Sequence, residues 1–380
     1  MLRTFAIILL ALVGARAEAQ PLPFIKSDST LTLLFIGDVM GHGPQINSAY
    51  DSVSDTYSYD TVFSRIKPFI ELSDVAIANL EVTLAGKPFS GYPQFSSPDA
   101  LATALKGAGV DALVTANNHS ADRGKQGITR TIEVLNREGI PHTGTFMDQA
   151  ERDTTYPLII EKNGFRLALL NCTYGTNGIE VPKPTIVNLI DTAQIRRDYY
   201  RARLLNVDEV IAFVHWGVEY QEEPNAEMEM VAAYLHKLGI RIVIGSHPHV
   251  IQRMEATYDS DIMVGNVTVY SLGNFVSNQR NRYRNGGALA YLKLTKHENK
   301  SQIKKGGYLL AWVHTPIRNG RKIYQVLPVS EYEQLDSYFG ADDQALFNEF
   351  AKDSRDLYGR RNKNFPELIF LKRTGKWLLP

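Results

Sequence analysis

In the first half of the chain, short apolar runs alternate with amphipathic stretches. Residues 31–36 form a continuous apolar run, which is typical of a strand buried on both faces. The same pattern predicts strands at 75–78 and 110–115 and helices at 59–72, 98–106 and 125–138. Such alternation favours an α/β fold in which helices flank a layered β-sheet core.

The second half extends this pattern and then changes it. A hairpin is predicted from 156–161 and 165–171, turning at Asn163 and Gly164, and a strand, helix and strand follow at 209–214, 227–238 and 241–244. Beyond Gly265, polar turns separate apolar runs, which predicts antiparallel strands at 267–272, 288–294, 308–314 and 322–329. Residues 342–358 combine helical spacing with many charges, so we expect a terminal surface helix.

The N-terminus has the three parts of a secretory signal over residues 1–19. Arg3 precedes an apolar run at 5–13, and Ala17-Glu18-Ala19 resembles a cleavage site. The run is shorter than the roughly 20 residues of a membrane-spanning helix, although an uncleaved signal would anchor the chain. We therefore expect a periplasmic or extracellular protein. After the signal we expect a linker at 20–30 and a main domain at 31–278. Residues 279–380 should add strands and a helix that pack on this domain.

Composition narrows the function classes. Cys172 is the only cysteine, which excludes an intramolecular disulfide, and a chain of 380 residues that is 44% hydrophobic can build a large core without one. Lys plus Arg and Asp plus Glu both total 41. This balance argues against a nucleic-acid partner, because nucleic-acid binders carry a basic surplus. Any attraction for an anionic ligand must be local.

Polar residues that can bind metal follow one core strand after another. The clusters begin with Asp38, Asn79, Asn117, His215 and Gly245, each just beyond a predicted strand. In open α/β sheets the carboxyl ends of the strands are where ligands bind. The pattern therefore predicts one shared site built from five loops.

Taken singly, these residues have simpler interpretations. Asp38 could cap a helix, Glu81 could be a solvated carboxylate, and His119 or His215 could be structural. His247 and His249 flank a proline after a strand, which favours metal ligation. So many ionisable groups in one cleft would repel without a cation. Oxygen and imidazole ligands without thiolate suit manganese, zinc or iron, and the residues do not choose among them.

As a set, the motifs resemble the CapA family of poly-γ-glutamate capsule biosynthesis proteins, whose domain resembles the calcineurin-like metallophosphoesterase fold. The resemblance covers residues 31–278. The residues that carry it are Gly37-Asp38-Val39-Met40, Asn79-Leu80-Glu81, Asn117-Asn118-His119 with Asp122, His215-Trp216-Gly217 with Glu219, Gly245-Ser246-His247-Pro248-His249 and Ser271-Leu272-Gly273-Asn274-Phe275.

This resemblance implies a role for each matching residue. It implies His119 as the catalytic acid or electrostatic stabiliser, poised by Asp122. The implied metal ligands are Asp38, Glu81, Asn118, His215, His247 and His249. Residues that would contact the substrate or support the ligands are His42, Asn79, Glu219 and Asn274. The bridging position holds Glu81 rather than the usual aspartate, and His42 follows Asp38 by four residues instead of two, so both one and two cations stay open.

The expected function is metal-dependent hydrolysis of a phosphoester or an envelope polymer, with the cation lowering the pKa of bound water from 15.7 towards about 7. The expected partners are an anionic small-molecule or polymer substrate and a membrane synthase complex. The alternative is a non-catalytic accessory that binds a polyanion during capsule assembly. Tyr220, Arg280, Arg282 and Arg284 are candidate anion contacts, although such a run is also typical of a solvated loop.

Overall fold

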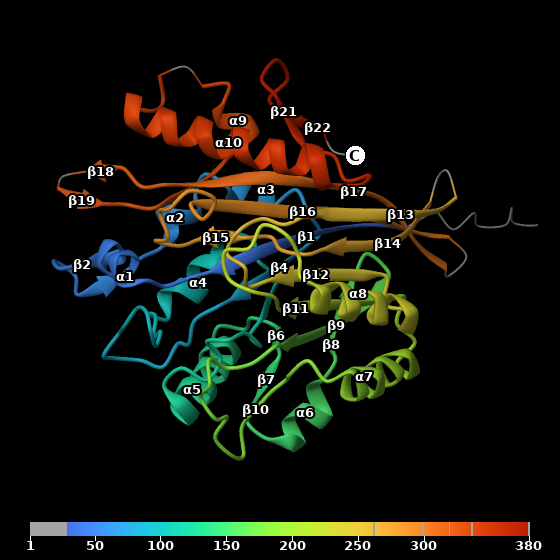
Figure 1. Cartoon of the computed structure of the whole chain (residues 1–380). Helices are drawn as coiled ribbons and strands as arrows, with labels where there is room; N and C mark the ends of the chain where they lie inside the picture. The colour runs from blue at the N-terminus through green and yellow to red at the C-terminus, as the bar shows by residue number, and fades with distance from the viewer. Residues whose placement is uncertain (1–28, 261–262, 298–299, 319, 336, 379–380) are drawn as a thin grey trace, which may run out of the picture.

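The computed structural model describes residues 29–260, 263–297, 300–318, 320–335 and 337–378 (Figure 1). The predicted signal at 1–19 and most of the predicted linker lie outside these residues. Within them, fourteen strands form one sheet. No helix of the described chain combines enough length and hydropathy to cross a bilayer.

Two groups of parallel strands form most of this sheet. One group runs in the order β6 (His142–Thr143), β5 (Ala112–Val114), β4 (Val75–Leu80) and β1 (Ser29–Val39). The other runs in the order β14 (Met263–Val269), β12 (Ile242–Ser246), β11 (Glu209–His215) and β9 (Phe165–Thr173). The antiparallel pair β16 (Gly286–His297) and β17 (Lys300–His314) joins them. The remaining members are β8 (Leu158–Lys162), β13 (Met254–Ser260), β15 (Asn274–Val276) and β20 (Gln325–Pro328).

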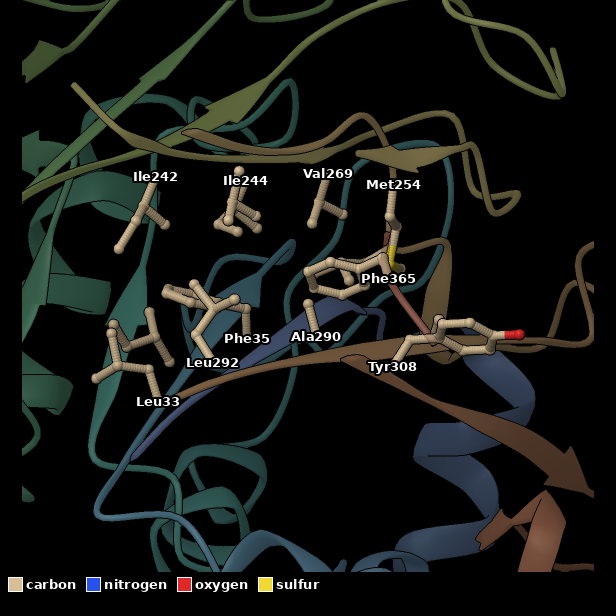
Figure 2. Close-up of a cluster of buried hydrophobic side chains, with 14 of the residues drawn as sticks. Leu33, Phe35, Ile242, Ile244, Met254, Val269, Ala290, Leu292, Tyr308 and Phe365 are labelled. Atoms are coloured by element: carbon tan, nitrogen blue, oxygen red, sulfur yellow. The ribbon is translucent and has the colours of Figure 1, made fainter. Parts of the chain in front are cut away.

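The two groups bury their inner faces against each other. Figure 2 shows Leu33 and Phe35 of β1 facing Ile242 and Ile244 of β12 across this core. The ring centroids of Phe35 and Phe213 are 6.4 Å apart. Long β-branched and aromatic side chains on alternate positions fill the space between two sheet layers. The core therefore fixes how the ends of the two strand groups lie relative to each other.

Helices cover the outer faces. The face formed by β1, β4 and β5 packs against α2 (Asp60–Phe63), α3 (Lys67–Ile70), α4 (Ala100–Gly107) and part of α5 (Gly124–Arg137). The face formed by β9, β11 and β12 packs against α7 (Thr192–Leu204) and α8 (Ala226–Leu238). Helix α10 (Ala341–Arg361) lies over β17 (Figure 1). The smaller elements are α1 (Gly43–Ala49), β2 (Tyr50–Asp51), β3 (Thr56–Tyr57), β7 (Thr145–Phe146), α6 (Gln149–Thr155), β10 (Ile186–Val187), β18 (Ile317–Arg318), β19 (Arg321–Lys322), α9 (Val329–Tyr332), β21 (Ile369–Leu371) and β22 (Lys376–Leu378).

This architecture confirms the predicted α/β fold class, and it corrects several elements. The helix predicted at 59–72 is two short helices, because Pro68 lies in the first turn of α3 and cannot continue a preceding helix. Strand β1 begins at Ser29, inside the predicted linker. The predicted surface helix is α10, which is amphipathic and buries Phe347, Phe350 and Leu357 in the core. Helix α7 was not predicted.

Truncating the aromatic contact at the centre of the core should test how much it stabilises the fold. Phe35 has no exposed surface, so Phe35→Ala should lower the free energy of unfolding by about 3–5 kcal/mol. Guanidinium unfolding measures this difference. Val53, which is 94% exposed, provides a control in Val53→Ala, where a change within about 0.5 kcal/mol is expected. A loss below about 1 kcal/mol for Phe35→Ala would contradict the packing described here.

Candidate metal centre

The carboxyl ends of the parallel strands from both groups meet at one place, and the five predicted loops converge there. In register, Asp38 of β1 lies beside Asn79 of β4, and His215 of β11 lies beside Ser246 of β12. Each of these side chains has no exposed surface. The core thus brings together residues that are far apart in the sequence, such as Asp38 and His249, which are 211 positions apart.

Glu81 is the centre of the cluster. Its Oε1 lies 3.5 Å from His215 Nε2 and 3.6 Å from His249 Nε2. Two groups of candidate metal ligands result, one of Glu81, His215 and His247 and the other of Asp38, Glu81 and His249. Within each group the ligand atoms lie within 4.8 Å of one another. Since Glu81 belongs to both groups, its carboxylate is placed where it could bridge two cations.

Two buried polar atoms of the cluster lack hydrogen-bond partners. Glu81 Oε1 and His247 Nδ1 are both shielded from solvent and accept or donate no hydrogen bond. An orphaned buried polar atom normally costs about 1–3 kcal/mol, so native structures rarely keep one without a ligand, ion or water. A divalent cation would accept electron pairs from both atoms, and mixed oxygen and imidazole donors suit manganese, zinc or iron. The residues present therefore fit a metal.

The loop that carries His247 and His249 has an unusual backbone. His247 has φ 103° and His249 has φ 57°, and both values lie in the region that favours glycine. Such conformations cost on the order of 1–3 kcal/mol each and are concentrated at functional sites. The result is that His249 Nδ1 lies 3.1 Å from Asp38 Oδ2, with its Nε2 towards Glu81. The strained loop thus directs two imidazoles to one centre.

His215 is held from both sides of its ring. Its Nε2 lies 2.8 Å from Asn118 Oδ1, and its Nδ1 lies 3.0 Å from Ser246 Oγ. A hydrogen bond to one ring nitrogen sets the orientation of the other, which is how proteins prepare histidines as metal ligands. Asn118 in turn donates its Nδ2 to Asn177 Oδ1 at 3.2 Å. The amide oxygen of Asn118 is therefore fixed beside the first ligand group.

Burial sets the charge state of the cluster. Burial, and then the nearby Asp38 carboxylate, raise the pKa of Glu81 well above its usual value. Burial lowers the pKa of His215 well below its usual value and that of His247 to about 3, with neighbouring imidazoles adding to both shifts. Neutral imidazoles have a free electron pair, which metal ligation requires. Ionising the buried Glu81 carboxyl is therefore unfavourable in the metal-free protein. A bound cation would stabilise the ionised form.

His119 and Asp122 form a buried pair next to the cluster. His119 Nδ1 lies 2.8 Å from Asp122 Oδ2, and that oxygen also accepts a hydrogen bond from the Phe95 backbone at 2.6 Å. The Phe95 ring meets the His119 ring edge-on with 4.6 Å between centroids. A carboxylate on Nδ1 fixes the tautomer and leaves Nε2 as the ring atom for proton transfer.

The four residues expected to contact the substrate or support the ligands differ in their distance from the cluster. Asn79 is inside the cluster, where its Nδ2 donates to Asp38 Oδ1 at 2.8 Å. Asn274 is buried and braces two loops by donating to the backbone oxygens of His249 and Arg284. His42 caps α1, and its Nδ1 lies 3.1 Å from Gln45 Oε1; neither candidate ligand group among the described residues includes it. Glu219 is half-buried at the rim.

Sequence reasoning missed the wall of the site formed by the segment after β9. Tyr174 lies over His247, with 4.6 Å between ring centroids, and Asn177 holds Asn118. Tyr174 is 44% exposed, so it lies at the mouth of a buried site. A Tyr after a predicted strand end was the available signal, since β9 runs parallel to β11. Tyr174 and Asn177 were missed because neither is a charged residue or a histidine.

The fold and the site together define a class of protein: an α/β protein with a candidate metal site of buried carboxylates and imidazoles at its strand ends. Comparison with known proteins identifies the family. The family model described as bacterial capsule synthesis protein PGA_cap matches residues 32–279, and the chain belongs to this family. The chain is 27% identical to capsule biosynthesis protein CapA of Bacillus anthracis over 294 residues, which are 73% of this chain and 68% of that protein. It is 26% identical to PGA biosynthesis protein CapA of Bacillus subtilis (strain 168), over 77% of this chain and 75% of that protein.

Similarity to solved structures is more distant. Calcineurin-like phosphoesterase YfkN from Bacillus subtilis aligns with 87% of this chain and 98% of its own, at 13% identity and a TM-score of 0.46. The 5'-nucleotidase from Candida albicans SC5314 aligns with 86% of this chain and 57% of its own, at 13% identity and a TM-score of 0.42. The family assignment depends on neither.

Proposed function

We propose that this chain is a metal-dependent hydrolase of capsule biosynthesis that acts on a phosphoester or on a linkage in an envelope polymer. The single observation that carries the proposal is the position of Glu81. Its orphaned, buried Oε1 lies 3.5 Å and 3.6 Å from the Nε2 atoms of His215 and His249. A structural role would have left this oxygen hydrogen-bonded or exposed.

The residues divide into two adjoining ligand groups. Glu81, His215 and His247, with the Asn118 amide oxygen beside them, would hold one cation; Asp38, Glu81 and His249 would hold a second. Bound there, a divalent cation supplies Lewis-acid polarisation of an anionic oxygen and a lowered pKa for water. Ser246 keeps the His215 ring in place from its other nitrogen. The buried setting excludes bulk water and strengthens these interactions.

His119 is proposed as the proton donor to the leaving group. Asp122 holds the Nδ1 side of the ring and Phe95 packs against its face, so the position of Nε2 is fixed before substrate binds. A positioned general acid contributes typically about 10²–10⁴-fold to a rate. The pair is built on a loop between β5 and α5, apart from the ligand loops of the second strand group.

Location and partners extend the same proposal. A secretory signal at residues 1–19 would deliver the chain to the periplasm or the cell exterior. The proposed partners are an anionic small-molecule or polymer substrate and a membrane synthase complex. The names of the relatives, which are capsule and PGA biosynthesis proteins, support a polymer substrate.

Asn79 favours one alternative, a non-catalytic accessory that binds a polyanion. Its amide nitrogen lies among Asp38 Oδ1 and the polar atoms of His215 and Ser246, at 2.8, 3.4 and 3.3 Å. A neutral amide occupies a position where a further carboxylate would strengthen binding of a second cation. Such a cluster could hold one cation or none and still provide a pocket.

Metal analysis combined with an assay separates the two functions. Purified wild-type protein should contain one or two divalent cations per chain and hydrolyse bis(p-nitrophenyl) phosphate, and a chelator should abolish both properties. Added manganese should restore the hydrolysis. A protein that contains no metal, stays inactive with manganese and still retains an acidic polymer would establish the accessory role instead.

A further inference from the structure

The loop after β15 carries three arginines, and the structure gives them different surroundings. Arg282 donates two hydrogen bonds to Asp353, from Nε at 2.7 Å and from Nη2 at 2.8 Å. Arg280 is largely buried, and its Nη1 is shielded from solvent without a partner. Arg284 instead lies over the Tyr220 ring, with its Cζ 3.8 Å from the ring centroid. Of the sequence candidates for anion contact, only Arg284 and Tyr220 thus come together.

A set of hydrogen bonds fixes Arg284 and Tyr220 beside the metal ligands. Asn274 Nδ2 donates to the backbone oxygens of His249 and Arg284, at 3.3 and 2.9 Å. The Tyr220 backbone N–H donates to the Pro248 oxygen at 2.8 Å. The Tyr220 and His249 ring centroids are 6.2 Å apart. The arginine is therefore attached to the histidine loop on two sides.

The guanidinium of Arg284 contacts the Tyr220 side chain rather than a carboxylate. Among the described residues, no carboxylate lies within 4 Å of it, whereas Arg282 has both Asp353 and Glu349 within that distance. Arg284 is half-buried, so stacking restricts its motion without hiding its donors. An arginine held flat on an aromatic ring presents a planar fork that matches carboxylate and phosphate oxygens.

The carboxyl groups of the site suggest a function for the positive charge of Arg284. The carboxyl groups of Asp38 and Glu81 have no exposed surface, and Glu219, one residue before Tyr220, adds a third carboxyl group that is half-buried. An anionic substrate would meet repulsion from these carboxylates unless cations offset it. A bound metal would offset it inside the cluster, and Arg284, which lies on Tyr220 near His249, would offset it beside the cluster.

We infer that Arg284, stacked on Tyr220, is the substrate-binding residue that grips an oxyanion beside the metal centre. The inference rests on the proposed function and narrows its substrate class to molecules with a phosphate or carboxylate group at this position. A charge-assisted, bidentate contact forms between the guanidinium and the oxyanion, and no bond is made or broken.

Isothermal titration of the manganese-loaded full chain tests the assignment, with inorganic phosphate and glutarate as separate probes. Arg284→Gln should weaken binding of at least one probe roughly 10-fold or more, because hydrogen bonds between charged groups are lost. The probe that weakens identifies phosphate or carboxylate as the group recognised. Arg282→Gln is the matched control, and its affinities should equal those of wild type because Asp353 already occupies that side chain.

Unchanged affinity of Arg284→Gln for both probes would overturn the assignment. Manganese content, measured on the same samples, keeps this outcome distinct from a failure of the proposed function. If wild type and Arg284→Gln contain equal manganese and bind the probes equally, only the role of Arg284 is wrong. If wild type takes up no manganese, the metal centre itself is wrong.

Discussion

Glu81→Gln is expected to lower the affinity for manganese at least about 100-fold. The substitution removes the anionic oxygen shared by both candidate ligand groups. Changing a group that merely hydrogen-bonds to a metal ligand already costs about 10–100-fold, so loss of the shared ligand should cost more. Equilibrium dialysis with metal analysis measures the affinity directly.

The melting temperature of metal-free Glu81→Gln shows whether the substitution disturbs folding. Burial and the neighbouring Asp38 raise the pKa of Glu81, so its ionisation destabilises the metal-free protein. A neutral glutamine relieves that repulsion, and chelated Glu81→Gln should therefore melt at the wild-type temperature or above it. Glu133→Gln, at an exposed position of α5 and outside both ligand groups, is the matched control with unchanged manganese content. Full manganese affinity in Glu81→Gln would contradict the assigned centre.

His119→Ala is expected to reduce hydrolysis of a phosphodiester by about 10²–10⁴-fold while leaving the metal in place. The ring contacts Asp122 and Phe95 and belongs to neither ligand group among the described residues. Asp122→Asn should give a smaller loss, because the ring keeps its place but loses the carboxylate that fixes its tautomer. Steady-state kinetics and metal analysis on the same preparations separate these effects.

His142→Ala is the control for this series. His142 hydrogen-bonds the Ile140 backbone oxygen at 2.9 Å on β6, outside the metal cluster, so its removal should leave turnover within about twofold of wild type. If His119→Ala also stays within a few-fold of wild type, His119 is not the proton donor.

Much of the fold could be predicted because local pattern and tertiary role agree. The run at 31–36 is apolar at every position except Thr32 because both faces of β1 are covered, one by the opposing sheet layer and one by helices. The turn at Asn163 and Gly164 could also be predicted from local sequence. Both residues have positive φ, at 50° and 78°, which a two-residue hairpin turn requires and which Asn and Gly adopt readily.

The elements that were missed lack such agreement. Helix α7 buries only Ile195, Asp198 and Ala202, and two of its large apolar side chains, Tyr200 and Leu204, are exposed, so its apolar positions do not form a stripe that can be recognised. Its start was still marked by Asp191, whose side chain accepts from the backbone of Ala193 and Gln194. The burial of one side of α10 depends on the surface of β17, which no local pattern reports.

Some features of the candidate metal centre could likewise be predicted from the sequence, and others could not. Position after a strand identified Asp38, Glu81 and His215 because the carboxyl ends of parallel strands meet at one edge. Sequence could not reveal that Glu81 is shared by two ligand groups, because that depends on distances across two sheet layers. Nor could it separate Arg284 from Arg282, since their difference lies in whether a carboxylate of α10 is within reach.

An anomalous difference map from a crystal of the manganese-soaked protein shows directly whether the cluster binds metal. We expect a peak within bonding distance of Glu81, His215 and His247, and a second beside Asp38, Glu81 and His249 if two cations bind. A map with no peak at Glu81, or with manganese only at the protein surface, would contradict this expectation.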